Sequence, residues 1–330
     1  MATRFKIQGQ ELYTRLNSIK LKSTHIGFMG KKGKVFANIS TPIACVYLDE
    51  VGTTNNDFNS IKLPLAAFKS LIFRKKDITF ELKNKLNIYG DNFSMEDIDY
   101  EEGDEFLKPK YEGGKPIILA KEFDIKAIKG LADSEFGVLI NKRGLLIGSG
   151  SRCLFIQPNK KVDAPNAIIH PDVLSLVNEE SKVIIDDKQT FIRNENSISV
   201  LANISQSRLD LDIVNKLIYS LKSASFTVSF EDLNALASDK SPAIKFKLEK
   251  GEVLTFTKTL GIMKRTLKVK SLKIKDKDIE LNISTSFLKQ LLTAMPKSDI
   301  EVVLGQHLGL RISNKDFIYL GLIGGMNYAW

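Results

Sequence analysis

Cysteine and histidine are scarce in this chain. Its 330 residues include two cysteines, Cys45 and Cys153, and three isolated histidines, His25, His170 and His307. Two cysteines do not make a disulfide framework, and no spacing of these residues matches a metal site. We therefore expect two buried thiols, no metal and no cofactor.

Signatures of catalysis are missing as well. No serine or cysteine lies in a nucleophile elbow. The segments G-K-K-G and G-S-G-S lack the strand-loop-helix context and the terminal Lys-Ser/Thr of a phosphate-binding loop. We interpret G-K-K-G as a hairpin turn and predict that the protein is not an enzyme.

Long apolar runs are also absent. None is long enough to cross a bilayer, and the first residues, Met1 to Phe5, have no apolar signal core. The chain is 43% hydrophobic and 26% charged, as in an ordinary soluble protein with two or three packed cores. The sequence therefore predicts a protein that stays in a reducing cytoplasm and has no membrane partner.

Basic residues are in excess, with a formal net charge of +9. An excess of this sign favours a polyanionic partner through counterion release, and it is also compatible with solubility alone. The placement of the charges must decide between the two.

The last fifth of the chain shows the unit from which the rest is built. Ser284 or Thr285 can cap a helix, and Pro296 stands where that helix must stop. Three segments of alternating polarity follow between 300 and 322, which predicts three strands. The apolar residues of the helix recur at helical spacing, and they are Phe287, Leu288, Leu291, Leu292 and Met295.

Similar units recur upstream, with equivalent helices roughly 110 residues apart. We expect helices at 9–19, in a segment centred on Phe68, Leu71 and Ile72, at 121–131, after His170 and at 229–237, each followed by strands. Cys45 and Cys153 fall at corresponding places in two repeats, so they should not pair within a chain. The pattern predicts an α+β protein of six strand-helix-three-strand modules in three domains, 1–110, 111–222 and 223–330.

The sequence predicts a linker between the first two domains but leaves the connection between the second and third domains open. Residues 92–114 hold the most acidic stretch, M-E-D-I-D-Y-E-E-G-D-E, followed by Pro and Gly, and we interpret this segment as a linker. Periodicity leaves residues 205–225 open between a strand and a short helix.

The repeated unit resembles the sliding clamps of DNA replication, specifically the three-domain bacterial-type beta clamp. The segments I-E-L-N-I-S-T-S-F-L-K-Q-L-L-T-A-M, S-D-I-E-V-V-L and F-I-Y-L-G-L-I are similar to its third domain in order and spacing, and G-S-G-S-R-C-L-F is similar to its partner-pocket segment. The chain departs from that family in its basic charge and in its G-G-M-N-Y-A-W ending. Its compact length suits a phage-encoded version.

The resemblance implies a processivity factor that encircles double-stranded DNA. Two chains would close head to tail into a homodimeric ring, with sheets outside and helices lining the hole. The ring would tether a DNA polymerase and would be loaded by a separate clamp loader ATPase.

The resemblance also implies two sets of site residues. Residues expected to contact DNA phosphates without sequence preference are Arg15, Lys20, Lys69, Arg74, Lys75, Lys126, Lys129 and Lys289. Residues expected around a hydrophobic groove for partner peptides are Leu145, Gly150, Arg152, Leu154, Leu320, Leu322, Ile323 and Met326. Trp330, the single tryptophan, is open between docking on its own subunit, anchoring a partner and having no role.

Two alternatives from other classes stay open. One is a monomeric factor of related fold that binds DNA through surface charge alone, and it would bind linear DNA in a salt-dependent way without a loader. The other is a structural repeat protein without a nucleic-acid role, which would grow into larger assemblies. The solution mass separates these possibilities, because a head-to-tail interface must close to give a ring.

Overall fold

The computed structural model describes residues 2–19, 21–73, 77–106, 108–109, 116–128, 131, 137–149, 152–164, 166–186, 188–194, 198–203, 224–258, 261–275 and 279–327. Its contacts form two compact units, Met1–Ala120 with Asp172–Ile204, and Lys121–Pro171 with Ser205–Trp330. The segment 205–225 lies almost entirely outside the described residues. The predicted domain boundaries at 110 and 222 stay predictions.

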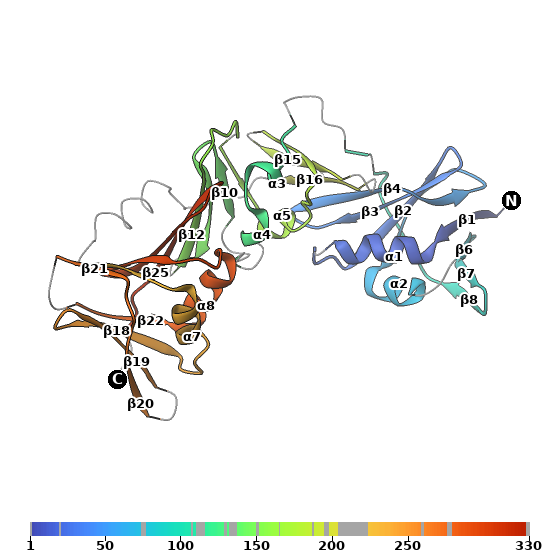
Figure 1. Cartoon of the computed structure of the whole chain (residues 1–330). Helices are drawn as coiled ribbons and strands as arrows, with labels where there is room; N and C mark the ends of the chain where they lie inside the picture. The colour runs from blue at the N-terminus through green and yellow to red at the C-terminus, as the bar shows by residue number, and fades with distance from the viewer. Residues whose placement is uncertain are drawn as a thin grey trace. The chain divides into compact units, whose positions relative to one another are not determined.

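The first unit is built on one antiparallel sheet of twelve strands (Figure 1). Its elements are β1 (Thr3–Gln8), α1 (Gly9–Ser18), β2 (His25–Lys31), β3 (Lys34–Ser40), β4 (Ala44–Thr54), β5 (Phe58–Pro64), α2 (Leu65–Ile72), β6 (Asp77–Leu82), β7 (Leu86–Gly90), β8 (Phe93–Ile98), β9 (Glu101–Glu102), α5 (Pro171–Leu174, at the unit boundary), β14 (Lys182–Ile185), β15 (Gln189–Arg193) and β16 (Ile198–Asn203). Nine of the strands follow the order β8-β7-β6-β1-β4-β3-β2-β5-β9, and the other three, β14, β15 and β16, join this path through the pairing of β16 with β4.

The second unit holds a sheet of nine strands and a sheet of four, in the order β20-β19-β18-β22. Its elements are α3 (Leu119–Glu122, at the unit boundary), α4 (Ile125–Ile128), β10 (Val138–Asn141), β11 (Gly144–Ser149), β12 (Arg152–Pro158), β13 (Ala167–Ile169), β17 (Ala224–Val228), α7 (Phe230–Ala237), β18 (Ala243–Glu249), β19 (Glu252–Lys258), β20 (Ile262–Thr266), β21 (Ser271–Ile274), β22 (Ile279–Ser284), α8 (Thr285–Ala294), β23 (Ile300–Leu304), β24 (His307–Ser313) and β25 (Phe317–Gly324).

The predicted repetition is present as a strand, a helical segment and three strands. It is complete in β1-α1-β2-β3-β4, β5-α2-β6-β7-β8, β13-α5-β14-β15-β16, β17-α7-β18-β19-β20 and β22-α8-β23-β24-β25. In the remaining module, before β10, β11 and β12, an isolated bridge at Ile117 stands in place of the first strand. The modules pair in one consistent way, because β5, β13 and β22 lie beside β2, β10 and β18. The α+β fold prediction is therefore confirmed.

Two helices begin at the caps that the sequence predicts. The Ser229 hydroxyl accepts a hydrogen bond from the Asp232 amide at 3.1 Å, and the Ser284 hydroxyl accepts one from the Phe287 amide at 3.4 Å. Each bond satisfies an amide that has no partner within the first turn of a helix. Helix α8 ends at Ala294, just before Pro296, as expected.

The single helix predicted at 121–131 is wrong, because α3 and α4 are two short helices. The break lies at Asp124, whose Oδ1 accepts a hydrogen bond from the Ala127 amide at 3.2 Å. Its Oδ2 accepts one from the Tyr319 hydroxyl at 2.8 Å. Aspartate at this point caps a new helix instead of continuing the old one. Phe123, Ile125 and Ile128 are buried there.

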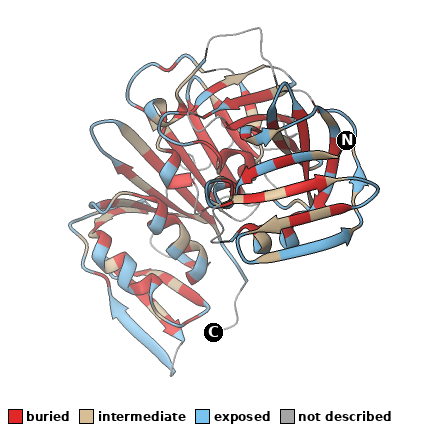
Figure 2. Ribbon diagram, turned by 90° about the vertical axis from the view of Figure 1, so that its right-hand side faces the viewer, coloured by how far each residue is buried: buried red, intermediate tan, exposed pale blue. Residues whose placement is uncertain are grey.

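Each core lies between a sheet and its helices, as the buried residues show (Figure 2). In the first unit, Phe5 stacks on Phe80 with ring centroids 4.6 Å apart, and Phe28 packs on Phe68 of α2 at 4.9 Å. These four rings are at most 2% exposed. Burial of each contributes about 1.5–3 kcal/mol relative to an exposed ring, so this cluster fixes α2 on the sheet.

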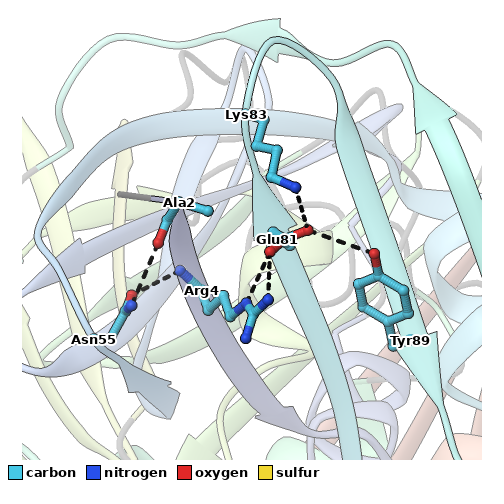
Figure 3. A network of polar contacts seen from close by, with 6 residues as sticks. All are labelled: Ala2, Arg4, Asn55, Glu81, Lys83 and Tyr89. Carbon is cyan, nitrogen blue, oxygen red and sulfur yellow. Dashed lines mark hydrogen bonds and ion pairs between the residues drawn. The ribbon is translucent and has the colours of Figure 1, made fainter.

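One buried carboxylate joins β1 to β6 (Figure 3). Glu81 is 3% exposed, and its Oε1 accepts a hydrogen bond from Arg4 Nε at 2.8 Å and lies 2.7 Å from Arg4 Nη2. The Lys83 ammonium lies 3.0 Å from Oε2, and the Tyr89 hydroxyl approaches it at 3.5 Å. Hydrogen bonds from Arg4, and then from Lys83, lower the pKa of Glu81 to about 2.

Candidate nucleic-acid and partner interfaces

Arg15 is the basic residue predicted to extend from the first helix. It lies on α1, but its side chain is only 10% exposed, and Nη2 donates a hydrogen bond of 2.8 Å to the Asp49 carbonyl of β4. Glu11 lies 4.0 Å from Nη1, one helical turn away. Burial lowers the pKa of Arg15 below its ordinary value, although the carboxylates of Glu11 and Asp49 act to raise it. The guanidinium thus fastens α1 to the sheet, and its predicted phosphate contact stays untested.

Lys69 is also turned toward the protein. This residue lies in the last turn of α2, and its Nζ donates a hydrogen bond of 3.2 Å to the Leu16 carbonyl of α1. The last carbonyls of a helix lack partners within that helix and carry its negative dipole end. Lys69 therefore joins α2 to the carboxyl end of α1.

Two of the predicted DNA contacts are exposed on helices. Lys126 lies on α4, and Lys289 lies on α8. Four others lie outside the described residues, namely Lys20, Arg74, Lys75 and Lys129. The structure therefore does not gather the eight residues into one described site.

The exposed helix faces carry few charges. On α1 they present one charged residue, Glu11, beside Gln10, Thr14, Asn17 and Ser18, and on α2 they present Ala66, Ala67 and Ser70. Helix α7 carries Glu231 in its first turn. The serine, threonine, asparagine and glutamine side chains can donate hydrogen bonds to phosphate, but they add no ionic attraction to it.

The predicted groove residues lie on both faces of one sheet. Strand pairing places Arg152 opposite Ile323, Leu154 opposite Gly321 and Phe155 opposite Leu320. Because side chains alternate along a strand, Leu145, Arg152, Leu154 and Ile323 share one face, and Leu320 and Leu322 share the other. Gly150 lies outside the described residues.

The first of these faces packs against α8. The Arg152 guanidinium lies 4.5 Å from the centre of the Phe287 ring, and a Cβ at Gly321 would come within 3.1 Å of Leu291. Leu145, Leu154 and Ile323 are fully buried there. These residues are core, and no partner can reach them without moving the helix.

The opposite face holds a separate apolar cluster. Its members are Leu139, Leu146, Cys153, Phe155, Leu320 and Leu322. Met326 follows β25, is 38% exposed and donates its amide to the Asn282 carbonyl at 2.9 Å. Cys153 and Phe155 were missed by the sequence reasoning, and the alternation of G-S-R-C-L-F together with the strand register would have identified them.

Two edge strands form a second feature that the sequence reasoning missed. Among the described strands, β8 pairs with β7 alone and β20 with β19 alone. All five residues of β20 are exposed, and this strand is pale blue at the bottom of Figure 2. The linker predicted at 92–114 is thus partly wrong, because its first residues form β8 and β9.

The two edges carry opposite charge. Strand β8 carries Glu96 and Asp97 and no basic residue, whereas β20 carries Lys264 and Arg265 and no carboxylate. Each edge also exposes apolar side chains, with Met95 47%, Ile262 61% and Met263 40% exposed. Exposed strand edges of this kind are templates for pairing with another chain.

Neither a metal centre nor a membrane helix is found in the described part of the chain. No three His, Cys, Asp or Glu side chains there lie close enough together to hold a metal ion. No helix in those residues is both long enough and apolar enough to cross a membrane.

The fold is similar to that of solved DNA polymerase sliding clamps. The sliding clamp of Bacillus subtilis matches with a TM-score of 0.78 and 14% identity over 100% of both chains. The DNA polymerase III beta subunit of Thermotoga maritima matches at 0.76 and 13% over 99% of this chain and 100% of the other. The beta chain from Streptococcus pneumoniae gives 0.75 and 13% over 99% and 100%. No protein-family model and no curated sequence matches. The chain has the sliding-clamp fold.

Proposed function

We propose that the protein is a DNA sliding clamp, a non-enzymatic processivity factor that encircles duplex DNA and tethers a replicative polymerase in the cytoplasm. The observation that carries this proposal is the sliding-clamp fold over the entire chain, at full coverage of the B. subtilis clamp. Partial coverage would have been compatible with a single clamp-like domain. A ring needs the complete set of repeated modules.

The strand pairing supports closure of a ring between two copies. The last strand of one module pairs with the last strand of another twice within the chain, as β4 with β16 and β12 with β25. The same rule leaves two last strands without such a partner among the described strands, β8 and β20. If β20 paired with β8 of a second copy, every last strand in a homodimer would pair with the last strand of another module.

Charge supports the head-to-tail direction of this contact. The edge at β8 is acidic and the edge at β20 is basic, so pairing of unlike edges is attractive. Pairing of two β8 edges or two β20 edges would place like charges together, which is destabilising. The contact is therefore heterologous, and its rotation must close to give a ring instead of a filament.

DNA would be held weakly inside such a ring. Lys126 and Lys289 would contact phosphates, together with Lys20, Arg74, Lys75 and Lys129, while Arg15 and Lys69 would act by placing α1 and α2. Contacts to phosphate alone carry no sequence information and weaken with salt. Retention on DNA would then depend on closure.

Partners would bind at the edge of the apolar cluster beside β12 and β25, where Leu322 is 9% and Met326 is 38% exposed. Leu320 and Leu322 would belong to that groove with Cys153 and Phe155, and Met326 would lie at its rim. A polymerase and an ATP-driven clamp loader are the partners that a clamp requires. Both would present short peptides with leucine or aromatic anchors.

The order of addition of protein and end blocks to linear DNA tests the proposal without a loader. A ring can thread over a free DNA end and is then trapped when streptavidin blocks both biotinylated ends. We expect retention that resists high salt when the protein is added before the blocks, and none when it is added after them. Equal, salt-sensitive binding in both orders would instead indicate tethering by charge. Absence of binding in both orders, with growth of the particles, would favour the structural repeat protein.

A further inference from the structure

A cavity of about 840 Å³ opens on the first unit, on the sheet face opposite α1 and α2. Its floor consists of Met29 on β2, Phe36 on β3, Tyr47 and Cys45 on β4, and Leu201 on β16. It therefore lies over the β4–β16 pairing. Nothing in the proposed clamp function uses this cavity.

The floor repeats the residue pattern of the apolar cluster in the second unit. Cys45 lies opposite Leu201 just as Cys153 lies opposite Leu322, and Met29 lies opposite Phe36 just as Leu139 lies opposite Leu146. The difference is exposure. Cys153, Leu139 and Leu322 are at most 9% exposed, whereas Cys45, Phe36 and Leu201 are only half-buried. The cavity thus offers an apolar floor that is still accessible.

The rim of this cavity is basic. Lys31, Lys32, Lys34 and Lys108 line it, and none of its described lining residues is a carboxylate. Glu105, Glu50 and Asp49 pair with Lys31, Lys34 and Lys108 from outside the lining. Lys32 forms no ion pair with the described residues. Apolar depth with a cationic rim fits a peptide that carries an aromatic or leucine anchor beside acidic residues.

The chain itself already places one such segment at the edge of the cavity. Phe106 is 9% exposed and packs edge-on against Tyr47, with ring centroids 6.0 Å apart. The preceding residue, Glu105, forms an ion pair of 2.9 Å with Lys31. An acidic residue followed by phenylalanine is thus bound by the same floor and rim, and the cavity remains open beside it.

From these observations we infer that this cavity, the β4–β16 pocket, is a second docking site, for an acidic peptide segment with an aromatic or leucine anchor from another protein. The inference goes beyond the proposed clamp function and does not require a ring. The peptide anchor packs on Phe36, Cys45 and Leu201, and its carboxylates pair with Lys32 and compete with Glu50 for Lys34. A protein with this site binds partners at two surfaces at once.

The probe is a fluorescein-labelled peptide, Asp-Glu-Phe-Leu-Asp-Glu, measured by fluorescence anisotropy with the full chain. We expect saturable binding that weakens about tenfold in Lys32→Glu with Lys34→Gln, since loss of one exposed ion pair weakens binding by up to roughly fivefold. The matched control is Lys250→Glu with Lys245→Gln. Lys250 has the same left-handed turn conformation as Lys32, with φ of 50° and 52°, and Lys245 is ion-paired as Lys34 is. This control variant should bind the peptide as the wild type does.

Cys45 supplies a second measurement that does not depend on charge. Burial raises the pKa of the Cys153 thiol to about 12, so a bulky maleimide should react first at half-buried Cys45 and fill the pocket. Labelling should abolish peptide binding in the wild type and have no effect in Cys45→Ser. Binding that survives both the rim substitutions and the label, or no binding of the peptide at millimolar concentration, would overturn the inference. A change of solution mass on labelling would make the occupant a second copy and also overturn it.

Discussion

Glu81 is a residue whose titration should be visible in the stability of the fold. Its folded pKa is about 2, held below its ordinary value of 4.5 chiefly by the hydrogen bond from Arg4. A lowered folded pKa stabilises the protein above the unfolded pKa, and this stabilisation is lost as the pH falls from 4.5 toward 2. We expect Glu81→Gln to lower the urea midpoint at neutral pH and to flatten its dependence on pH over this range.

The same substitution at Glu252 is the control, because Glu252 is exposed and forms no ion pair with the described residues. It should leave both the midpoint and its slope with pH near the wild-type values. A Glu81→Gln protein that loses stability between pH 4.5 and 2 as steeply as the wild type would contradict the assigned cause.

Individual side chains were the hardest part to predict from sequence. Arg15 and Lys69 lie on helices where the spacing predicts them, but the sequence does not show that the Asp49 and Leu16 carbonyls are within reach. Long basic side chains often lie along the surface of their own protein, and tertiary contacts decide whether they do so or extend into solvent. The Glu81 cluster was missed for the same reason, since it joins residues 77 positions apart.

At the scale of elements, the cap of α7 gives a prediction. The Ser229 hydroxyl both accepts from the Asp232 amide and donates to the Asp232 carboxylate at 2.8 Å. Loss of an N-cap of this type costs about 0.5–2 kcal/mol. We expect Ser229→Ala to lower the free energy of unfolding by roughly 1 kcal/mol, measured by urea denaturation.

Ser70→Ala is the matched control for this cap. Ser70 is exposed within α2, where alanine is the better helix former, so the change should be neutral or slightly stabilising. Equal destabilisation by the two substitutions would show that the cap bond of Ser229 is not the cause.

Helix and strand order was largely predictable, because periodicity and caps are local signals. The predicted helices at 9–19 and 229–237 and the three terminal strands agree with α1, α7, β23, β24 and β25. Sheet faces were not predictable in the same way. Leu154 and Leu320 look alike in sequence, and only the register of β12 against β25 places them on opposite faces. The break at Asp124 depends on Tyr319, which is remote in sequence.

At the scale of the whole molecule, repetition was the strongest signal. Six similar modules can be recognised without a single shared motif, because each must bury one helix against one sheet. Repetition predicts which strands pair within a chain, and by the same rule it predicts which strands remain for a neighbour. The charges on β8 and β20 then decide the direction of pairing.

Charge exchange between these two edges therefore tests the assembled ring. Lys264→Glu with Arg265→Glu makes the β20 edge acidic, so it should repel β8 of a second copy and halve the solution mass toward the 37.0 kDa of one chain. Glu96→Lys with Asp97→Asn should do the same from the other side, and asparagine suits the positive φ of 56° at Asp97. In a dimer of one copy of each variant, one edge pair is charge-exchanged and the other is the wild-type pair, so the mixture should return to twice the chain mass. One chain carrying all four changes has two charge-exchanged edge pairs and should reach that mass alone. The matched control is Lys250→Glu with Lys297→Glu. It changes the net charge by as much as the β20 pair of substitutions but lies off the edges, so it should leave the mass at twice the chain mass.

Two results of light scattering would contradict this prediction. If the wild type and all variants have one mass, these strands do not close the ring. If the single-edge variants dissociate and the chain with all four changes does not reassociate, charge on the edges does not align them.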